Sequence, residues 1–206
     1  MPRVELITVG DELLSGLVLN SNVARVADAI AIGAVHVAAW RSTYPGILPD
    51  LFLARLSVSR QAAHYDAAIR GGTGVLVATA SGADVPLGSG PRIIGFATAG
   101  RARHAEIGGK RLAEGEVETL YVLDDWPDRG VGRRLMRAAA SHLVDIGCKS
   151  AFCWVLRDNP SRWFYQRIGG KPVAEASIRI GGEKVSQTAF VWDPIEQLLA
   201  ASPQAS

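Results

Sequence analysis

One stretch limits the possible folds of this chain more than any other: residues 115–147, GEVETLYVLDDWPDRGVGRRLMRAAASHLVDIG. Its first part, residues 115–125, is rich in residues that favour a strand. Beyond it, apolar residues recur on one helical face and a glycine follows as terminator: Leu135, Ala139, Leu143, Ile146 and Gly147. The pattern predicts a strand that runs through a short glycine-containing loop into an amphipathic helix.

The start of that helix is a candidate anion site, with the sequence Asp128-Arg129-Gly130-Val131-Gly132-Arg133. Backbone N–H groups at a helix N-terminus lack partners and carry the positive end of the dipole. Glycines let a phosphate approach these donors, so a pyrophosphate cradle is predicted, although two glycines here also suit a simple tight turn. The spacing matches neither a Walker loop nor a dinucleotide-binding fingerprint.

Composition favours one domain with a sizeable core, because 48% of the 206 residues are apolar. The net charge of +2 gives no electrostatic argument for nucleic acid or a membrane surface. No apolar run reaches the roughly 18 residues of a membrane span, and no signal-peptide pattern is present, so we expect a cytoplasmic protein. Cys148 and Cys153 are expected to be buried thiols, and the histidine spacing predicts no metal site.

The remaining pattern places strands and helices around this stretch. Strands are predicted over residues 4–9, 17–20, 74–80, 92–100 and 148–156, with a closing hairpin turned by Gly181-Gly182. Helices are predicted over residues 24–40, from Asp50, over residues 60–69, and from Asn159-Pro160 to Gly169. We expect an α/β (α+β) protein in three parts: an N-terminal segment (1–22), one domain (23–195) and a flexible tail (196–206).

Four segments, in order and spacing, resemble the GNAT superfamily of acyl-CoA-dependent N-acetyltransferases over residues 24–193. They are AVHVAAWRSTYPGILPD, GEVETLYV with RGVGRRLM, WVLRDNPSRWFYQRIGGKPV and GGEKVSQTAFVW. The resemblance implies an acyltransferase that moves an acetyl group from acetyl-CoA to a primary amine by direct attack in a ternary complex. It also implies a mixed, mostly antiparallel sheet with helices on both faces, and a cofactor cleft between strands at about 116–123 and 150–156.

The resemblance implies the contacts with acetyl-CoA as well. The family's pyrophosphate loop, Q/R-x-x-G-x-G/A, falls on Pro127 to Gly132, where proline replaces the first residue and Asp128 adds a negative charge. The strand before it is expected to pair with the pantetheine arm through its backbone. Asn159 is expected to contact that arm, or to cap a helix, or both. The implied set is Tyr121, Val122, Leu123, Asp128, Arg129, Gly130, Val131, Gly132, Arg133 and Asn159.

The catalytic residues are likewise implied by the family pattern. Tyr165, in the run Phe164-Tyr165-Gln166-Arg167-Ile168-Gly169, matches the tyrosine that protonates the departing thiolate, and a phenol is protonated at neutral pH. Glu116, or Glu118 on the same face of the strand, matches the general base, although either could simply face solvent. Trp40, Arg41 and Tyr44 lie where relatives shape the acceptor pocket, although aromatic residues at a helix end also serve as packing.

The first 22 residues carry a second resemblance, to the start of the molybdopterin-binding domain of competence/damage-inducible proteins, through VELITVGDELLSGLVLNSN. A pterin-binding protein therefore stays a rival reading, as does a catalytically weak acyl-CoA-binding module. We expect the segment to supply an edge strand, through residues 4–9 or 17–20. The acceptor, whether a small molecule or a peptide amine, cannot be read from the sequence. A homodimer is compatible with the family.

Overall fold

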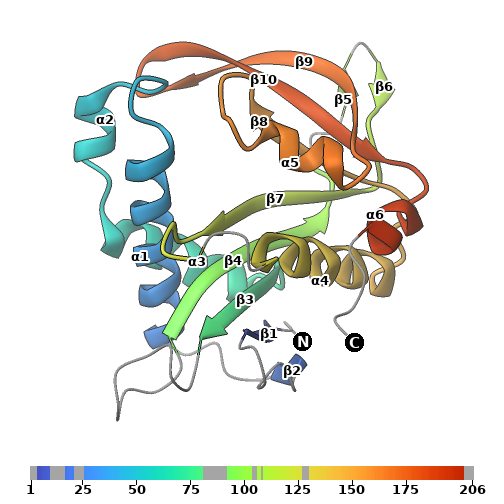
Figure 1. Cartoon of the computed structure of the whole chain (residues 1–206), viewed down its shortest axis with the longest axis horizontal. Helices are drawn as coiled ribbons and strands as arrows, with labels where there is room; N and C mark the ends of the chain where they lie inside the picture. Colours follow the sequence, from blue (N-terminus) through green and yellow to red (C-terminus); the bar gives the residue numbers. More distant parts are fainter. Residues whose placement is uncertain are drawn as a thin grey trace.

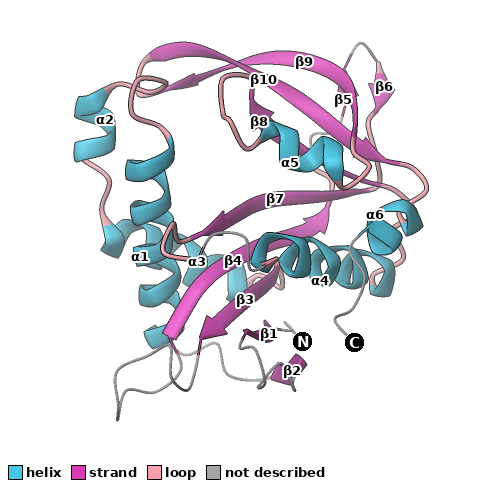
Figure 2. Ribbon diagram, viewed as in Figure 1, coloured by secondary structure: helices cyan, strands magenta, loops and turns pink. Residues whose placement is uncertain are grey.

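The computed structural model describes residues 4–9, 17–20, 26–80, 92–103, 106–107, 109–126 and 130–201, with side chains from Asp28 onward apart from Lys110. Its main sheet has the strand order β2-β1-β3-β4-β7-β8-β10-β9 (Figures 1 and 2). The pairs β1–β3 and β7–β8 are parallel and the other pairs are antiparallel. The expected mixed, mostly antiparallel sheet is therefore confirmed.

The strands of this sheet are β1 (Val4–Val9), β2 (Leu17–Asn20), β3 (Gly74–Ala80), β4 (Arg92–Arg101), β7 (Gly115–Val122), β8 (Ala151–Leu156), β9 (Lys171–Ile180) and β10 (Glu183–Trp192). A separate small ribbon pairs β5 (Glu106–Ile107) with β6 (Lys110–Arg111). The helices are α1 (Val26–Thr43), α2 (Asp50–Ala54), α3 (Val58–Arg70), α4 (Val131–Asp145), α5 (Arg162–Arg167) and α6 (Glu196–Ala201). Within the described residues, no helix is both long and apolar enough to cross a bilayer.

Helices cover both faces of the sheet, and β3 shows why (Figure 1). Every residue of β3 is buried, because alternate side chains point to opposite faces. Val75 and Val77 pack with Ile32 of α1 and Tyr65 of α3. Leu76 packs on the other face, in the cluster that contains α4. Burying an aliphatic side chain of this size contributes about 1.5–3 kcal/mol, so each face supplies substantial stabilisation.

Helix α4 follows the predicted amphipathic pattern, and it terminates at the predicted glycine, Gly147. Leu135, Ala139 and Leu143 are fully buried against the sheet. Gly147 has a φ of 82°, and the amide of Cys148 donates to the carbonyl of Leu143 at 2.9 Å. This is a Schellman-type end, which favours glycine because it needs a left-handed residue. The predicted helix end is therefore confirmed.

The strands β7 and β8 pair over only two register positions, Gly115 with Ala151 and Glu116 with Phe152. Beyond that point each strand follows its other neighbour: β7 stays with β4 as far as Val122, and β8 stays with β10 as far as Leu156. Because the two strands part, the sheet opens between them. The opening positions the candidate site.

The structure differs from the sequence prediction at the C-terminal segment and at the start of α5, and it shortens two predicted strands, with β7 ending at Val122 and β8 beginning at Ala151. Residues 196–201 were expected in a flexible tail but form α6, whose Leu198 is fully buried; Arg137 of α4 also donates to the carbonyl of Leu199 at 2.7 Å. Helix α5 begins at Arg162, later than expected. At the other end, β1 and β2 lie at one edge of the sheet. The resemblance of residues 1–22 to a pterin-binding domain stays a prediction.

Gly33 sets the distance between α1 and α3. A Cβ added there would lie 2.8 Å from both the amide nitrogen of Ala62 and the carbonyl oxygen of Val58. Both atoms belong to the α3 backbone, so no side chain could move aside to make room. The two helices can pack this closely only because position 33 has no side chain.

We predict that Gly33→Ala lowers the free energy of unfolding by about 1–2 kcal/mol, because two backbone contacts at 2.8 Å place the overpacking cost at about 2–3 kcal/mol and alanine recovers at most about 1 kcal/mol of helix propensity. Urea unfolding measures the change. Ala34→Ser, at the exposed neighbouring position, is the control and should change stability by less than about 0.7 kcal/mol. An unchanged or raised stability in Gly33→Ala would contradict the prediction.

Candidate functional site

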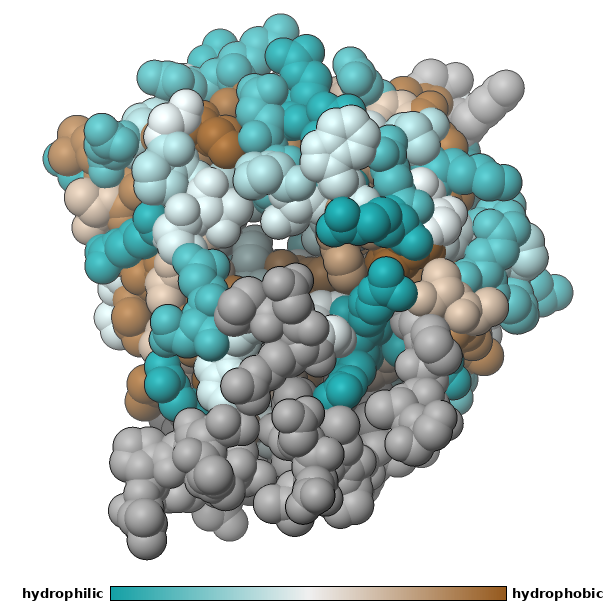
Figure 3. All heavy atoms as spheres, viewed as in Figure 1, coloured by the Kyte–Doolittle hydropathy of each residue, from teal (hydrophilic) through white to brown (hydrophobic). Residues whose placement is uncertain are grey.

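A cavity of about 830 Å³ occupies the opening between β7 and β8. Figure 3 shows this face of the molecule hollowed near its centre, with hydrophobic residues visible inside. Side chains and backbone from α1, β7, α4, β8, α5, β9 and β10 line it. The lining includes Trp40, Thr43, Tyr44, Val117, Glu118, Thr119, Leu120, Tyr121, Val122, Asp124, Gly130, Val131, Gly132, Arg133, Cys153, Trp154, Asn159, Phe164, Tyr165, Arg167, Ile178, Ile180 and Gln187.

The N-terminus of α4 forms part of the wall, as the glycine pattern predicts. Gly130 caps the helix in the left-handed conformation, with a φ of 69°, and it makes no side-chain cap. The first amides of a helix have no partner within it, so those of Val131, Gly132 and Arg133 are available as donors. A Cβ on Gly132 would touch the Phe164 ring at 3.4 Å, so a larger residue would crowd this wall. The predicted contacts Asp128 and Arg129 lie outside the described residues.

The edge of β7 that faces the opening provides a second set of backbone groups. The amide of Leu123 donates to the carbonyl of Ile94 at 2.8 Å, which turns the backbone of Leu123 towards β4. Because successive residues of a strand direct their backbone groups to opposite sides, those of Val122 and Leu120 face the opening. The sequence placed this edge at Tyr121, Val122 and Leu123. In the structure the backbone of Val122 faces the opening, as predicted. The backbones of Tyr121 and Leu123 face β4 instead, and Leu120 is the second residue at the open edge.

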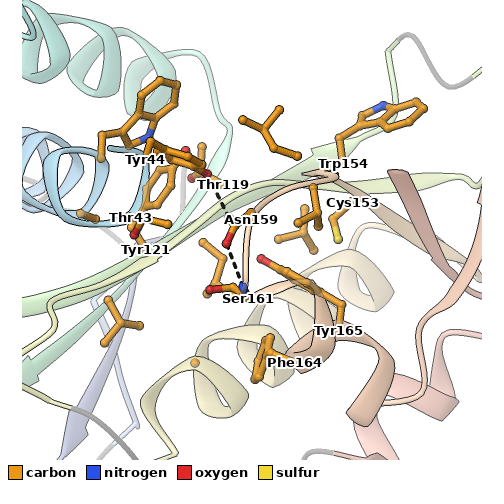
Figure 4. A pocket seen from close by; sticks show the side chains of 18 of the residues that line it. Thr43, Tyr44, Thr119, Tyr121, Cys153, Trp154, Asn159, Ser161, Phe164 and Tyr165 are labelled. Carbon is orange, nitrogen blue, oxygen red and sulfur yellow. Dashed lines mark hydrogen bonds between the residues drawn. The ribbon is translucent and has the colours of Figure 1, made fainter. Parts of the chain in front are cut away.

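Asn159 joins the two sides of the cavity (Figure 4). Its Nδ2 donates to the Tyr44 hydroxyl at 3.2 Å, and its Oδ1 accepts from the amide of Ser161 at 2.8 Å. The side chain therefore caps the turn that precedes α5, rather than the helix itself as the sequence suggested. The residue is buried and lines the cavity, so it ties the end of α1 to the start of α5.

Tyr165 projects from α5 with its hydroxyl directed into the cavity (Figure 4). Its ring stacks on Phe190 at a centroid distance of 5.9 Å and an interplanar angle of 24°, which fixes the side chain. Burial, together with the neighbouring Cys153, raises the pKa of the Tyr165 phenol well above its usual value. The phenol therefore stays protonated throughout the neutral range, as a proton donor must.

The two predicted carboxylates take different positions because β7 carries a bulge. Thr98 pairs with Thr119 and Ala99 pairs with Val117, so Glu118 is an extra residue opposite β4. Glu118 lines the cavity and its Oε2 accepts from the Thr98 hydroxyl at 3.4 Å. Glu116 does not line it. Burial raises the pKa of Glu116 to about 7, and the like charge of Glu118 adds to this effect.

An aromatic cluster forms the wall on the α1 side. Trp40 meets Tyr44 edge-on at 5.0 Å and Tyr121 at 6.4 Å. Behind it, the buried ring of His36 stacks on Trp40 at 5.0 Å and shares a 2.7 Å hydrogen bond with the Tyr65 hydroxyl. Burial lowers the pKa of His36 to about 4, so this imidazole is neutral at physiological pH.

Arg41, predicted to contact the acceptor, is placed elsewhere. Its guanidinium donates to the carbonyls of Leu53, Ala54 and Leu56, at 3.1–3.2 Å, and it does not line the cavity. It holds the end of α2 against α1. Sequence reasoning missed His36 and Tyr65; the only local signal was that His36 lies one helical turn before Trp40 and so on the same face.

Comparison with known proteins identifies the family. The model of the Acetyltransferase (GNAT) family matches residues 36–170. The uncharacterized N-acetyltransferase YuaI of Bacillus subtilis is 31% identical over 175 residues, which cover 85% of this chain and 93% of YuaI. The chain belongs to the GNAT acetyltransferase family.

Solved structures agree with this assignment at the level of the fold. The ribosomal-protein-alanine N-acetyltransferase of Brucella melitensis superposes with a TM-score of 0.58 at 18% identity, covering 84% of this chain and 98% of that one. The putative acetyltransferase yncA of Salmonella typhimurium, solved with its cofactor acetyl-CoA, gives 0.56 at 21% identity, covering 84% and 91%. This GNAT acetyltransferase therefore has the fold, and is of the enzyme class, that its sequence indicates.

The cavity of this acetyltransferase has donors suited to acetyl-CoA. The amides at the start of α4 suit a pyrophosphate, and the free edge of β7 suits the amides of a pantetheine arm. The bare Cα of Gly132 leaves room beside Phe164. All three features are observed in this chain itself.

We predict that Asn159 and Tyr44 act as a unit. Asn159→Ala should lower the free energy of unfolding by about 1–3 kcal/mol, because it removes two hydrogen bonds and leaves buried polar groups unpaired. Tyr44→Phe should cost about 0.5–1.5 kcal/mol. Urea unfolding of both single variants and the double variant measures the coupling, expected at about 0.5 kcal/mol or more. Strict additivity of the two losses would contradict the prediction.

Proposed function

We propose that this acetyltransferase transfers the acetyl group of acetyl-CoA to a primary amine by direct attack within a ternary complex. The observation that carries the proposal is the cavity at the parting of β7 and β8, where the amides at the start of α4 and the Glu118 carboxylate both line the wall. The two substrates would meet in the gap between the strands. Holding them together there would convert a bimolecular reaction into an effectively unimolecular one.

The reaction needs a base for the ammonium and an acid for the departing thiolate, and the site offers a group for each. The amine arrives as an ammonium and loses a proton to the carboxylate pair, with Glu118 at the cavity wall and Glu116 beside it. The amine nitrogen then bonds to the thioester carbonyl carbon, and the carbon–sulfur bond breaks as the acetamide forms. Tyr165 gives its proton to the departing thiolate, and the proton that the amine nitrogen loses as the acetamide forms returns to the Tyr165 phenolate. Burial of Tyr165 beside Cys153 keeps the phenol proton available.

Binding of acetyl-CoA is the first test. A ligand that binds only the folded protein stabilises it by RT ln(1 + [L]/Kd), about 2.7 kcal/mol at a concentration 100 times Kd. We expect acetyl-CoA to raise the melting temperature of the full chain in a concentration-dependent way, and adenosine alone to raise it much less. No rise at millimolar acetyl-CoA would overturn the proposed function.

We predict that Tyr165→Phe lowers kcat by about 100-fold or more, because proton transfer by a positioned side chain contributes about 10²–10⁴-fold. The Kd for acetyl-CoA should stay unchanged, since phenylalanine keeps the ring and its stacking on Phe190. Release of free CoA thiol measures kcat, and thermal shift measures Kd. A variant with unchanged turnover on an accepted amine would remove Tyr165 from this role.

We predict that kcat/KM for the amine rises with pH around 7, as Glu116 loses its proton. Glu116→Gln should abolish this rise with pH. Glu175 is an exposed carboxylate outside the cavity, so Glu175→Gln should leave the rise in place. If kcat/KM of Glu116→Gln still rises around pH 7, the rise does not come from Glu116.

The same raised pKa has a consequence for stability that does not depend on turnover. A carboxyl whose pKa is raised on folding binds its proton more tightly in the native state, so stability falls as pH rises from about 4.5 to 7. His36 acts in the opposite direction, because its pKa is lowered. The difference between wild type and Glu116→Gln in urea unfolding across this range therefore isolates Glu116.

A further inference from the structure

The cavity has two chemically different halves, which lie on opposite faces of the sheet. The half on the α4 face is lined by the start of α4 and by residues of its core cluster, such as Val117, Cys153 and Tyr165. The half on the α1 face contains Trp40, Tyr44 and Tyr121, with Ile180 packed into the same cluster as Trp40 and Tyr44. We call this second half the acceptor half; its other members are Thr43, Glu118, Thr119, Trp154, Ile178 and Gln187.

Aromatic rings form much of the wall of the acceptor half, and they are fixed by their neighbours. Trp40 is held by the stacked ring of His36 and by the edge-on ring of Tyr44, each at a centroid distance of 5.0 Å. His36 in turn is fixed by its hydrogen bond to Tyr65. Such rings bury an apolar body well, and their faces also attract a cation within about 6 Å.

The charge that the described residues bring to the acceptor half is negative. Glu118 supplies a carboxylate, and no lysine or arginine among the described residues lines this half. The arginines of the cavity, Arg133 and Arg167, come from α4 and α5 on the other side. Arg41 is committed to the carbonyls at the end of α2. An ammonium is therefore well received here, whereas a carboxylate or phosphate on the acceptor would be buried without a counter-charge.

We propose that the acceptor is a monoamine with an apolar body, of the size of an aromatic ring and its linker, and with no anionic group beside the amine. The proposal rests on the proposed function and narrows its substrate. The amine lies towards Glu118, and the apolar body lies against Trp40, Tyr44 and Tyr121. Amino acids are excluded by the charge of their carboxylate. A polyamine is disfavoured because Glu118 is the one carboxylate among the described residues of this half, and Ile178 and Ile180 of β9 give a second ammonium no counter-charge.

Three acceptors of matched shape test the charge argument: 2-phenylethylamine, L-phenylalaninamide and L-phenylalanine, each assayed with acetyl-CoA at pH 8 by release of CoA thiol. We expect kcat/KM for 2-phenylethylamine to exceed that for phenylalanine by roughly 100-fold or more, because the added carboxylate lacks a partner. Phenylalaninamide, which has the same bulk without the charge, should lie within about 10-fold of 2-phenylethylamine. Spermidine should be a poorer acceptor than 2-phenylethylamine.

A charge added to the acceptor half tests the location. Gln187→Lys is similar in length and introduces an ammonium, so it should raise kcat/KM for phenylalanine relative to 2-phenylethylamine by about 10-fold or more. Ile180→Arg is a second variant with the same expected direction, in case the first folds poorly. Leu51→Arg, at a position 62% exposed and outside the cavity, is the control and should change neither ratio.

The outcomes separate this inference from the proposed function. If acetyl-CoA raises the melting temperature but phenylalanine or spermidine matches 2-phenylethylamine, or if 2-phenylethylamine is not acetylated, the acceptor inference is overturned and the proposed function stands. If Gln187→Lys and Ile180→Arg both leave the preference unchanged, the acceptor half has been wrongly located. If acetyl-CoA does not bind, the proposed function itself fails.

Discussion

The parting of β7 and β8 is the constraint on which the site depends. A sheet normally satisfies its backbone groups by continuous pairing, and here the ladder stops after two positions. The strands part because each is held along its length by a different neighbour, β4 for one and β10 for the other. The bulge at Glu118 bends β7 near the point of parting. The opening therefore follows from ordinary strand pairing, and it leaves backbone donors and acceptors facing a cavity.

That opening explains why residues from so many elements meet. It passes between the strands, so α4 and α5 reach it from one face and α1 from the other. Asn159 connects the two, with one hydrogen bond to Tyr44 at the end of α1 and one within the turn before α5. The chemistry would take place where both faces have access. No single helix or strand carries the whole site.

The sequence predicted the features that depend on local patterns. The strand, glycine turn and helix of residues 115–147 were recognisable because propensity, a left-handed glycine and helical periodicity all act over a few residues. The bulge was not predictable, because it exists only in the register with β4; as a result Glu118, rather than Glu116, faces the cavity. Arg41 was wrongly predicted to contact the acceptor for a similar reason, because the packing of α2 against α1 brings its three carbonyl partners to it.

The two halves of the cavity differ in how strongly a side-chain substitution would affect ligand recognition. On the α4 side, recognition would rely on helix amides and a strand edge, which most side chains leave intact. Pro127 stands where the family pattern has Gln or Arg. Because recognition would rely on backbone donors such as the amide of Gly132, it does not require the side chain that the proline replaces. On the α1 side, the wall consists of side chains held by one another, from Tyr65 through His36 to Trp40. Selection of the acceptor would be the property that changes most readily by substitution, because its specificity resides in side chains.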